Sequence, residues 1–323
     1  MALSAAYLGK RLAQALPTLF LVAVIVFLAV RLTPGDPALV KLGPYGAKTP
    51  EQVAAVRQSM GLDKPIPIQF VIWLRDVLRG DMGLSLRNGR PALGLVVDRL
   101  PASLELIGAS LLFGLLVGVP VGVIAATRRG QWVDRAVSAG ALLGMATPPF
   151  WLALLLIGLF SVELRWLPAS GYVAITESPV LNLRLLVLPV VALGLFETAN
   201  VARFVRSGMV QALDSDFVRT ARAKGLAERA VLYKHALRNT MVTVVTVVGL
   251  EMGTLLSGTV IVEQVFGWSG LGWLSLQALN MRDYPVVQAS VLLVAVLMVL
   301  INLTVDLVYG LVDPRVRIEA KGL

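Results

Sequence analysis

The sequence predicts an all-α integral membrane protein with six transmembrane helices and a small external helical insertion after the first of them. Three observations support this prediction: the composition, six apolar stretches of span length, and the placement of the basic residues. Of the 323 residues, 57% are hydrophobic and 15% are charged, whereas soluble domains carry about 25% charged residues. The mean hydropathy of +0.78 agrees, so we expect the chain to lie in a lipid bilayer.

The first apolar stretch covers residues 12–30 and leads into Arg31 and Pro34. A signal peptide has a shorter apolar core of about 7–15 residues, followed by a small-residue cleavage site. The stretch therefore predicts an uncleaved first span. The later spans are expected at 101–126, 136–160, 185–205, 239–262 and 285–311.

Basic residues predict the orientation of these spans. Connections 127–135 and 203–238 hold three and eight basic residues, whereas 161–184 and 263–284 hold two and one. Cytoplasmic loops carry the excess of Lys and Arg, so the first two connections and both termini are expected in the cytoplasm. The predicted segments are 1–31, the cytoplasmic end and first span; 32–97, an external helical region; 98–312, a five-helix core with a cytoplasmic segment at 213–238; and 313–323, a cytoplasmic tail.

The external region carries its own helix signals. Thr49, Pro50 and Gln52 have the spacing of an N-cap, a proline at the first helical position and a capping-box partner. Gly61 is placed to end this first helix, and Gly80 to end a second amphipathic helix that follows. We therefore expect a small folded helical insertion.

Glycines spaced four residues apart predict close helix contacts inside the spans. Two interpretations are open, namely packing within one bundle and an interface with another subunit. The glycine sets are 114, 118 and 122; 140 and 144; and 249 and 253.

No enzyme signature is present in the sequence. It contains no phosphate-binding G-x-x-x-x-G-K-[ST] loop, no cysteine and a single histidine, His235. Each intramembrane carboxylate lies on a different predicted span, which does not support an aspartyl dyad; the four are Glu105, Glu197, Glu251 and Asp306. We therefore expect no catalytic, cofactor or metal site. Nucleic acid is not expected either, because the charge of +9 is concentrated beside the spans, where it meets anionic lipid.

Carboxylates inside spans are costly, and they usually face a protein interior or a water path. Glu197 and Glu251 lie centrally in their predicted spans, and Asn200 lies one turn from Glu197. These three residues are candidates for the lining of a translocation path. The alternative is that they are protonated or hydrogen-bonded contacts between helices.

Segment 213–238 has the clearest mechanical pattern. Asp214 to Asp216 offer N-caps, and Arg219 and Arg222 share one face of the predicted helix. Phe217 is grouped with Ala221 and Lys224 on a neighbouring face, Gly225 permits a sharp turn, and residues 227–237 continue as a second short helix. Such a helix fits the groove of a partner protein, and the alternative is a polybasic stretch on lipid head groups.

These residues resemble the inner-membrane permease subunits of bacterial ABC importers, specifically the dipeptide/oligopeptide permease family. The motif runs over residues 219–226, with sequence RTARAKGL, and is followed by HALRN at residues 235–239. The wider superfamily has Glu-Ala-Ala, then a glycine, and later Ile-x-Leu-Pro. Gly225 matches that pattern, while Arg219, His235 and Arg238 depart from it as the peptide branch does. Further matching motifs from Pro34 to Arg315 extend the resemblance over nearly the whole chain.

The resemblance implies a type I ABC importer permease fold in the bacterial inner membrane. It also implies a complex with a homologous second permease subunit, two ATPase subunits and an external solute-binding protein. ATP hydrolysis would occur in the ATPase subunits. The expected substrate is a peptide, with nickel complexes, glutathione or oligosaccharides as alternatives. A passive channel or a membrane scaffold is the competing class of function.

Two sets of contact residues follow from this implied complex. The loop 263–284 is expected to form a short external helix or re-entrant piece under the binding protein, with simple aromatic anchoring at the membrane interface as the alternative. Its candidate contacts are Trp268, Ser269 and Trp273. The expected ATPase-coupling residues are Asp216, Phe217, Arg219, Thr220, Ala221, Arg222, Lys224, Gly225 and Leu226.

Overall fold

The computed structural model describes residues 5–32, 36–42 and 49–312. The predicted tail 313–323, residues 1–4 and the side chain of Asp306 lie outside the described residues. The described chain forms two compact units. One contains Ala102–Trp268 and residues 301–312, and the other contains Ala5–Pro101 and Ser269–Leu300. We call them the first and second unit.

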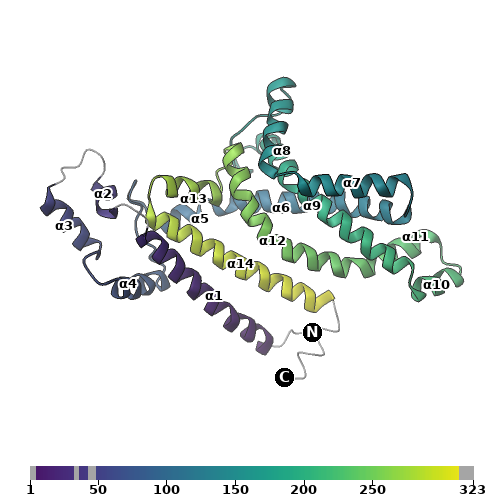
Figure 1. Cartoon of the computed structure of the whole chain (residues 1–323), viewed down its shortest axis with the longest axis horizontal. Helices are drawn as coiled ribbons and strands as arrows, with labels where there is room; N and C mark the ends of the chain where they lie inside the picture. Colours follow the sequence, from purple (N-terminus) through teal and green to yellow (C-terminus); the bar gives the residue numbers. More distant parts are fainter. Residues whose placement is uncertain (1–4, 33–35, 43–48, 313–323) are drawn as a thin grey trace. The chain divides into compact units, whose positions relative to one another are not determined.

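The first unit is built around the 35-residue helix α9. Each of its two main hydrophobic clusters includes residues of α6, α9 and α12. In Figure 1, α7 runs alongside α9, and α8 turns away from the direction of α7. The elements of this unit are α6 (Leu100–Thr127), α7 (Trp132–Ala146), α8 (Pro149–Leu156), η1 (Ile157–Glu163), α9 (Pro179–Leu213), α10 (Asp216–Ala223), α11 (Glu228–Ala230), η2 (Val231–Leu237) and α12 (Arg238–Phe266).

The second unit joins the first helix, the insertion and most of the last helix. Phe27 of α1 packs against Phe70 and Trp73 of α4, with ring centroids 5.3 and 5.4 Å apart. Leu292 of α14 shares a small core with Ala23 of α1. The elements are α1 (Ala5–Leu32), α2 (Pro37–Leu42), α3 (Pro50–Ser59), α4 (Ile66–Leu78), α5 (Ala92–Val97), α13 (Leu271–Asn280) and α14 (Tyr284–Val312). Helix α6 begins in the second unit and continues in the first, and α14 likewise ends in the first unit.

The helix signals of the insertion are confirmed. The Thr49 hydroxyl accepts a hydrogen bond from the Gln52 amide, and the Gln52 side chain accepts one from the Thr49 amide. Gly61 and Gly80 follow α3 and α4 with φ of 65° and 83°, a left-handed conformation that glycine adopts without steric cost. A further contact was not anticipated: Asp283, directly before α14, accepts hydrogen bonds from the Ser85 hydroxyl and the Leu86 amide.

Four helical segments of the described chain are long and apolar enough to cross a membrane, and a fifth crossing exists if α7 and α8 count as one span. The prediction of an all-α membrane protein is confirmed, while the count of six is confirmed only in part. Helix α12 covers the predicted span 239–262 without a break, and the sixth crossing stays a prediction. The four segments are Ala13–Leu32, Ala92–Thr127, Pro179–Leu213 and Tyr284–Val305.

The predicted third span, 136–160, is not a single helix. Helices α7 and α8 meet at a bend of 99°. Pro148 and Pro149 have no amide hydrogen to continue the helical ladder, and a residue that precedes proline is driven towards extended backbone. Thr147 and Pro148 accordingly have ψ of 117° and 132°. The proline pair therefore makes a sharp turn inside the predicted span.

The glycines of α6 pack within the chain. A Cβ atom added at Gly114, Gly118 or Gly122 would lie 2.7 to 2.9 Å from atoms of Glu197, Val201 or Val205 on α9. Real side chains do not tolerate such short contacts, so glycine is what lets the two backbones approach. Packing within one bundle is therefore the correct interpretation for this glycine set.

We expect Gly122→Ala to lower the stability of the folded permease by about 1–3 kcal/mol, because a Cβ there would lie 2.7 Å from the Ala202 carbonyl oxygen. Gly108→Ala is the matched control on the same helix, since nothing lies within 4 Å of its Cβ position. Alanine favours helix over glycine by about 1 kcal/mol, so the control should be neutral or stabilising. Thermal unfolding of the purified protein, followed by circular dichroism, measures both. Equal shifts for the two variants would contradict the close-packing explanation.

Candidate functional site

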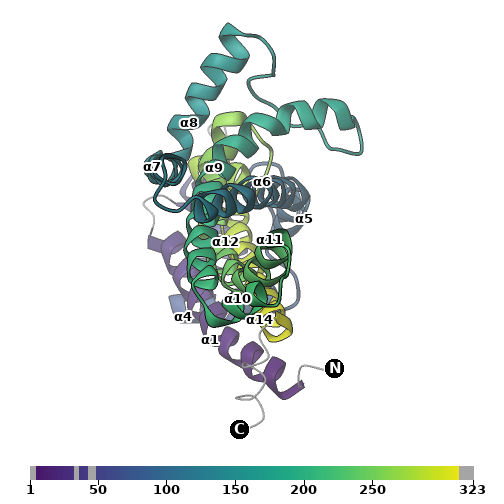
Figure 2. The same ribbon diagram turned by 90° about the vertical axis from the view of Figure 1, so that its right-hand side faces the viewer.

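Helix α10 directly follows the C-terminal end of α9. The chain leaves α9 at Leu213, and α10 begins at Asp216 after the N-cap Ser215. The predicted start is confirmed, but no side chain caps it: the Ser215 hydroxyl donates instead to the Ala212 carbonyl. At about 1.5 Å per residue α9 is about 52 Å long, which exceeds the apolar thickness of a bilayer by about 20 Å. The last turns of α9 can therefore hold α10 outside the apolar layer. Figures 1 and 2 show α10 at the end of α9.

The two faces of α10 differ from the predicted grouping. Val218 and Ala221 are buried and pack against Val231 of η2 and Leu213. Phe217, which the sequence placed with Ala221, is 44% exposed. The buried face holds α10 to the following helix, so the Phe217 ring stays available to a partner.

Gly225 ends the α10 turn as predicted. Its φ is 75°, and the Leu226 amide donates back to the Ala221 carbonyl. The predicted second short helix is confirmed as α11 and η2, which continue into α12 without a break. Helix α10 is thus connected to both α9 and α12 by short, structured joints.

The arginines of α10 have partners within the segment. Arg222 donates to Glu228 with Nη2 2.7 Å from Oε1, and Arg219 lies 3.2 Å from Asp216. The hydrogen bonds from Arg222 hold the pKa of Glu228 below its usual range. A lowered carboxyl pKa stabilises the fold above the ordinary pKa and loses this effect as pH falls through the lowered value, so the Arg222–Glu228 pair is fully ionised at neutral pH. Exposed ion pairs contribute little to the stability of the fold. An acidic group of a partner protein can therefore take the place of Glu228 or Asp216 beside these arginines.

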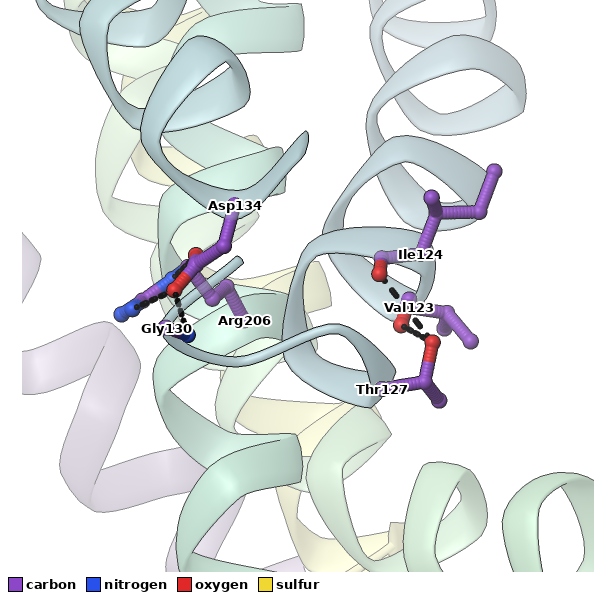
Figure 3. A network of polar contacts seen from close by, with 6 residues as sticks. All are labelled: Val123, Ile124, Thr127, Gly130, Asp134 and Arg206. Atoms are coloured by element: carbon purple, nitrogen blue, oxygen red, sulfur yellow. Dashed lines mark hydrogen bonds and ion pairs between the residues drawn. The ribbon is translucent and has the colours of Figure 1, made fainter. Parts of the chain in front are cut away.

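A second contact ties the first turn of α7 and the loop before it, between α6 and α7, to α9 (Figure 3). Asp134 is 4% exposed and accepts hydrogen bonds from Nε and Nη2 of Arg206 and from the Gly130 amide. Arg129 of the same loop reaches Asp214, with 2.8 Å between Nη1 and Oδ2. We call these two ion pairs the loop clamp. It joins the start of the broken span to the end of α9 that carries α10, and the sequence did not indicate it.

Arg206→Ala should destabilise the permease by about 3 kcal/mol, because it leaves the buried Asp134 carboxylate with only the Gly130 amide. Arg129→Ala is the control, since that pair is exposed and is expected to cost less than about 1 kcal/mol. The double variant Asp134→Asn/Arg206→Gln should recover part of the loss because it removes the uncompensated charge. Chemical or thermal unfolding of all three variants tests this order. An Arg129 variant as unstable as the Arg206 variant would refute it.

The candidate path residues lie in the interior of the first unit. Glu197 is 1% exposed, and neither of its carboxylate oxygens has a hydrogen-bond partner. Asn200, one turn further along α9, is buried with its Nδ2 unpaired. Glu251 of α12 is half-buried. Helices α9 and α12, which carry Glu197 and Glu251, pack against each other.

Glu197 lines a cavity of about 490 Å³. The cavity lies between the break of the bent span, α9 and α12. Its lining residues are Met145, Ala146, Thr147, Pro148, Pro149, Leu193, Phe196, Glu197, Thr254, Leu255, Ser257 and Gly258.

One of the predicted binding-protein contacts needs correction. Trp268 is 0% exposed: its indole nitrogen donates to the Ala102 carbonyl at 2.8 Å, and its ring packs against Tyr172. The residue is part of the core, because a buried indole N–H needs a partner and finds one there. Ser269 and Trp273 are partly exposed, and the Arg99 guanidinium lies 5.6 Å from the Trp273 ring centre. The predicted short helix in this loop is confirmed as α13.

Comparison with known proteins agrees with this arrangement. Residues 118–318 match the family described as binding-protein-dependent transport system inner membrane component, and residues 5–107 match the N-terminal part of such components. The structure is also similar to an inward-facing methionine ABC transporter, MetNI, with a TM-score of 0.56 at 22% identity, covering 68% of this chain and 96% of that one. At this identity the likeness shows the fold.

Two relatives are similar over almost their full lengths. A putative peptide transport system permease protein of Brucella abortus is 43% identical over 96% of this chain and 98% of its own. The glutathione transport system permease protein GsiC of Salmonella choleraesuis is 43% identical with the same coverage. The chain therefore belongs to the family of binding-protein-dependent transport system inner membrane components.

Proposed function

We propose that this chain is one transmembrane permease subunit of an ATP-driven importer, and that it forms half of a path for peptides delivered by an external binding protein. One observation supports this above the others: α10 presents an exposed Phe217 while its opposite face is packed onto η2. An exposed apolar side chain on a short, well-anchored helix is suited to a groove in a partner. Because the chain belongs to this transport family, we infer that the partner is an ATPase subunit.

The proposed complex contains a homologous second permease subunit, two ATPase subunits and the binding protein, in the bacterial inner membrane. The ATPase subunits carry out hydrolysis, and their groove holds α10 through Phe217 and Leu226, both of which are exposed. When the ATPase pair closes, α10 moves with it. Helices α9 and α12 follow through their direct connections, and the loop clamp carries the movement to α7.

Two further contacts are part of the proposal. The path between the two permease subunits passes Glu197, Asn200 and Glu251, which bring polar groups into an otherwise apolar interior. The binding protein rests on the surface around Ser269 and Trp273. Glutathione is the second candidate substrate, because a relative of the same 43% identity is named for its transport, and glutathione is itself a small peptide.

Gly225→Val should uncouple ATP hydrolysis from transport while the permease still reaches the membrane. A valine is strained at φ of 75°, so the turn that presents α10 would be distorted. Gly61→Val is the matched control, because Gly61 also follows a helix with positive φ, at 65°, but lies in the insertion. The measurements are peptide uptake and ATPase activity of the complex purified with its ATPase subunits, with and without loaded binding protein.

The Gly61 variant should keep the stimulation of ATP hydrolysis by loaded binding protein, and the Gly225 variant should lose most of it. Normal uptake and normal stimulation in the Gly225 variant would rule out the coupling role. A permease that purifies without any ATPase subunit would instead favour a passive channel or a scaffold.

The proposed topology places both termini and residues 213–238 in the cytoplasm and residues 32–97 outside. Reporter fusions after Ser59 and after Arg229 should therefore report opposite sides of the membrane, because an odd number of spans separates them. Alkaline phosphatase and a fluorescent protein, which are active on opposite sides, give complementary signals. Two fusions active on the same side would overturn the topology.

A further inference from the structure

Helix α4 of the insertion packs against two membrane-crossing helices of the second unit, α1 and α14 (Figure 1). The Phe70 ring of α4 lies 6.0 and 5.3 Å from the rings of Phe20 and Phe27 of α1, measured between ring centres. Trp73, one turn further along α4, packs against the small core that includes Leu292 of α14. One face of α4 is therefore held by both helices.

These contacts lie well inside the apolar segments of α1 and α14. The apolar segment of α1, Ala13–Leu32, has 20 residues, which is about the length that crosses the apolar layer of a bilayer. At about 1.5 Å per residue, Phe27 and Phe20 lie about 8 and 18 Å along the helix from the end of this segment. Leu292 lies about 12 Å from the start of the α14 segment Tyr284–Val305 by the same measure. Two spans thus independently place the packed face of α4 below the surface of the apolar layer.

The opposite face of α4 is mostly apolar and is not covered by the chain. Ile68, Val71 and Leu78 are three and seven residues apart, so they lie on the same side of the helix. The exposed fractions of Val71 and Leu78 are 64% and 79%. Arg75 shares this side, and its Nη2 lies 2.8 Å from Oδ1 of Asp76. A helix with apolar side chains on both its packed and its exposed face is suited to apolar surroundings.

The exposed face of α4 adjoins the exposed apolar surface of α1. Phe20, Leu21 and Ile25 of α1 are exposed, and they belong to a helix long and apolar enough to cross a membrane. Lipid is the expected surroundings of such side chains. Because Phe20 contacts Phe70 of α4, the two exposed apolar surfaces meet at this aromatic pair.

Helix α3 of the same insertion has a different surface. Its large apolar residues Val53 and Val56 are half-buried, and its exposed positions include Glu51, Arg57 and Gln58. Charged and amide side chains favour water, so α3 provides a contrast to α4 within the same insertion.

We propose that α4 is an interfacial helix, with Val71 and Leu78 embedded in the lipid of the leaflet on the side of the insertion. Interfacial helices bury their apolar face about 5–10 Å into the boundary between head groups and acyl chains, which agrees with the depth of Phe27. The long Arg75 side chain can carry its guanidinium to the lipid head groups. The insertion is then anchored to the membrane at α4, while α3 stays in water. This lipid contact goes beyond the proposed function and is independent of the transported substrate.

Spin labelling at single cysteines tests the surroundings of α4. The sequence contains no cysteine, so each introduced cysteine carries the only nitroxide label of the full-length protein, which is purified and reconstituted into vesicles of phosphatidylethanolamine and phosphatidylglycerol. Val71→Cys and Leu78→Cys report on α4. Gln58→Cys on α3 is the matched control in water, and Ile25→Cys on α1 is the reference in lipid. All four positions are exposed, so the labels do not disturb the packing of the core.

Collisions of each label with oxygen, which concentrates in lipid, and with a water-soluble nickel chelate are then measured. The ratio of oxygen to nickel accessibility at positions 71 and 78 should be several-fold higher than at position 58 and close to the ratio at position 25. Labels at 71 and 78 that the nickel chelate reaches as readily as the label at 58 would place α4 in water and overturn the proposal. Labels that neither reagent reaches would reveal a protein partner on this face, which would overturn it as well.

Discussion

The close packing of α9 against the glycine face of α6 is the contact on which the rest of the first unit depends. Gly114, Gly118 and Gly122 lie against Glu197, Val201 and Val205, and there is no room for a side chain at any of the three glycines. Because association in lipid relies on van der Waals contact rather than on a hydrophobic driving force, this fit fixes the position of α9. Every other element of the site is placed by α9, from the cavity to α10.

The buried polar side chains of the first unit fall into two groups. Some have partners: the Ser103 hydroxyl donates to Glu263 at 2.6 Å, and Trp268 donates to Ala102. These bonds hold helices together, since a satisfied polar group in an apolar interior is stable. Glu197 has no such partner. Burial alone does not separate the two groups, since Glu197 and Glu263 are both buried.

Helix α10 is joined to the rest of the first unit at several points. Its buried face is packed onto η2, its N-terminus follows α9, and η2 continues into α12. The pair Asp134–Arg206 adds a third connection, to α7. Helix α10 is therefore connected, directly or through these contacts, to three of the helices of the first unit.

The sequence by itself determined the features that depend on neighbouring residues. The capping box at Thr49 and the glycine turn at Gly225 follow from local backbone chemistry, and both predictions are confirmed. The break at Pro148 has a cause of the same local kind. Tertiary structure alone decided the burial of Trp268 and the exposed side of Phe217. It also decided the pairs Asp134–Arg206 and Ser85–Asp283, which are 72 and 198 residues apart in the chain. Such side-chain pairs depend on which helices pack together, and a local pattern of residues does not determine that packing.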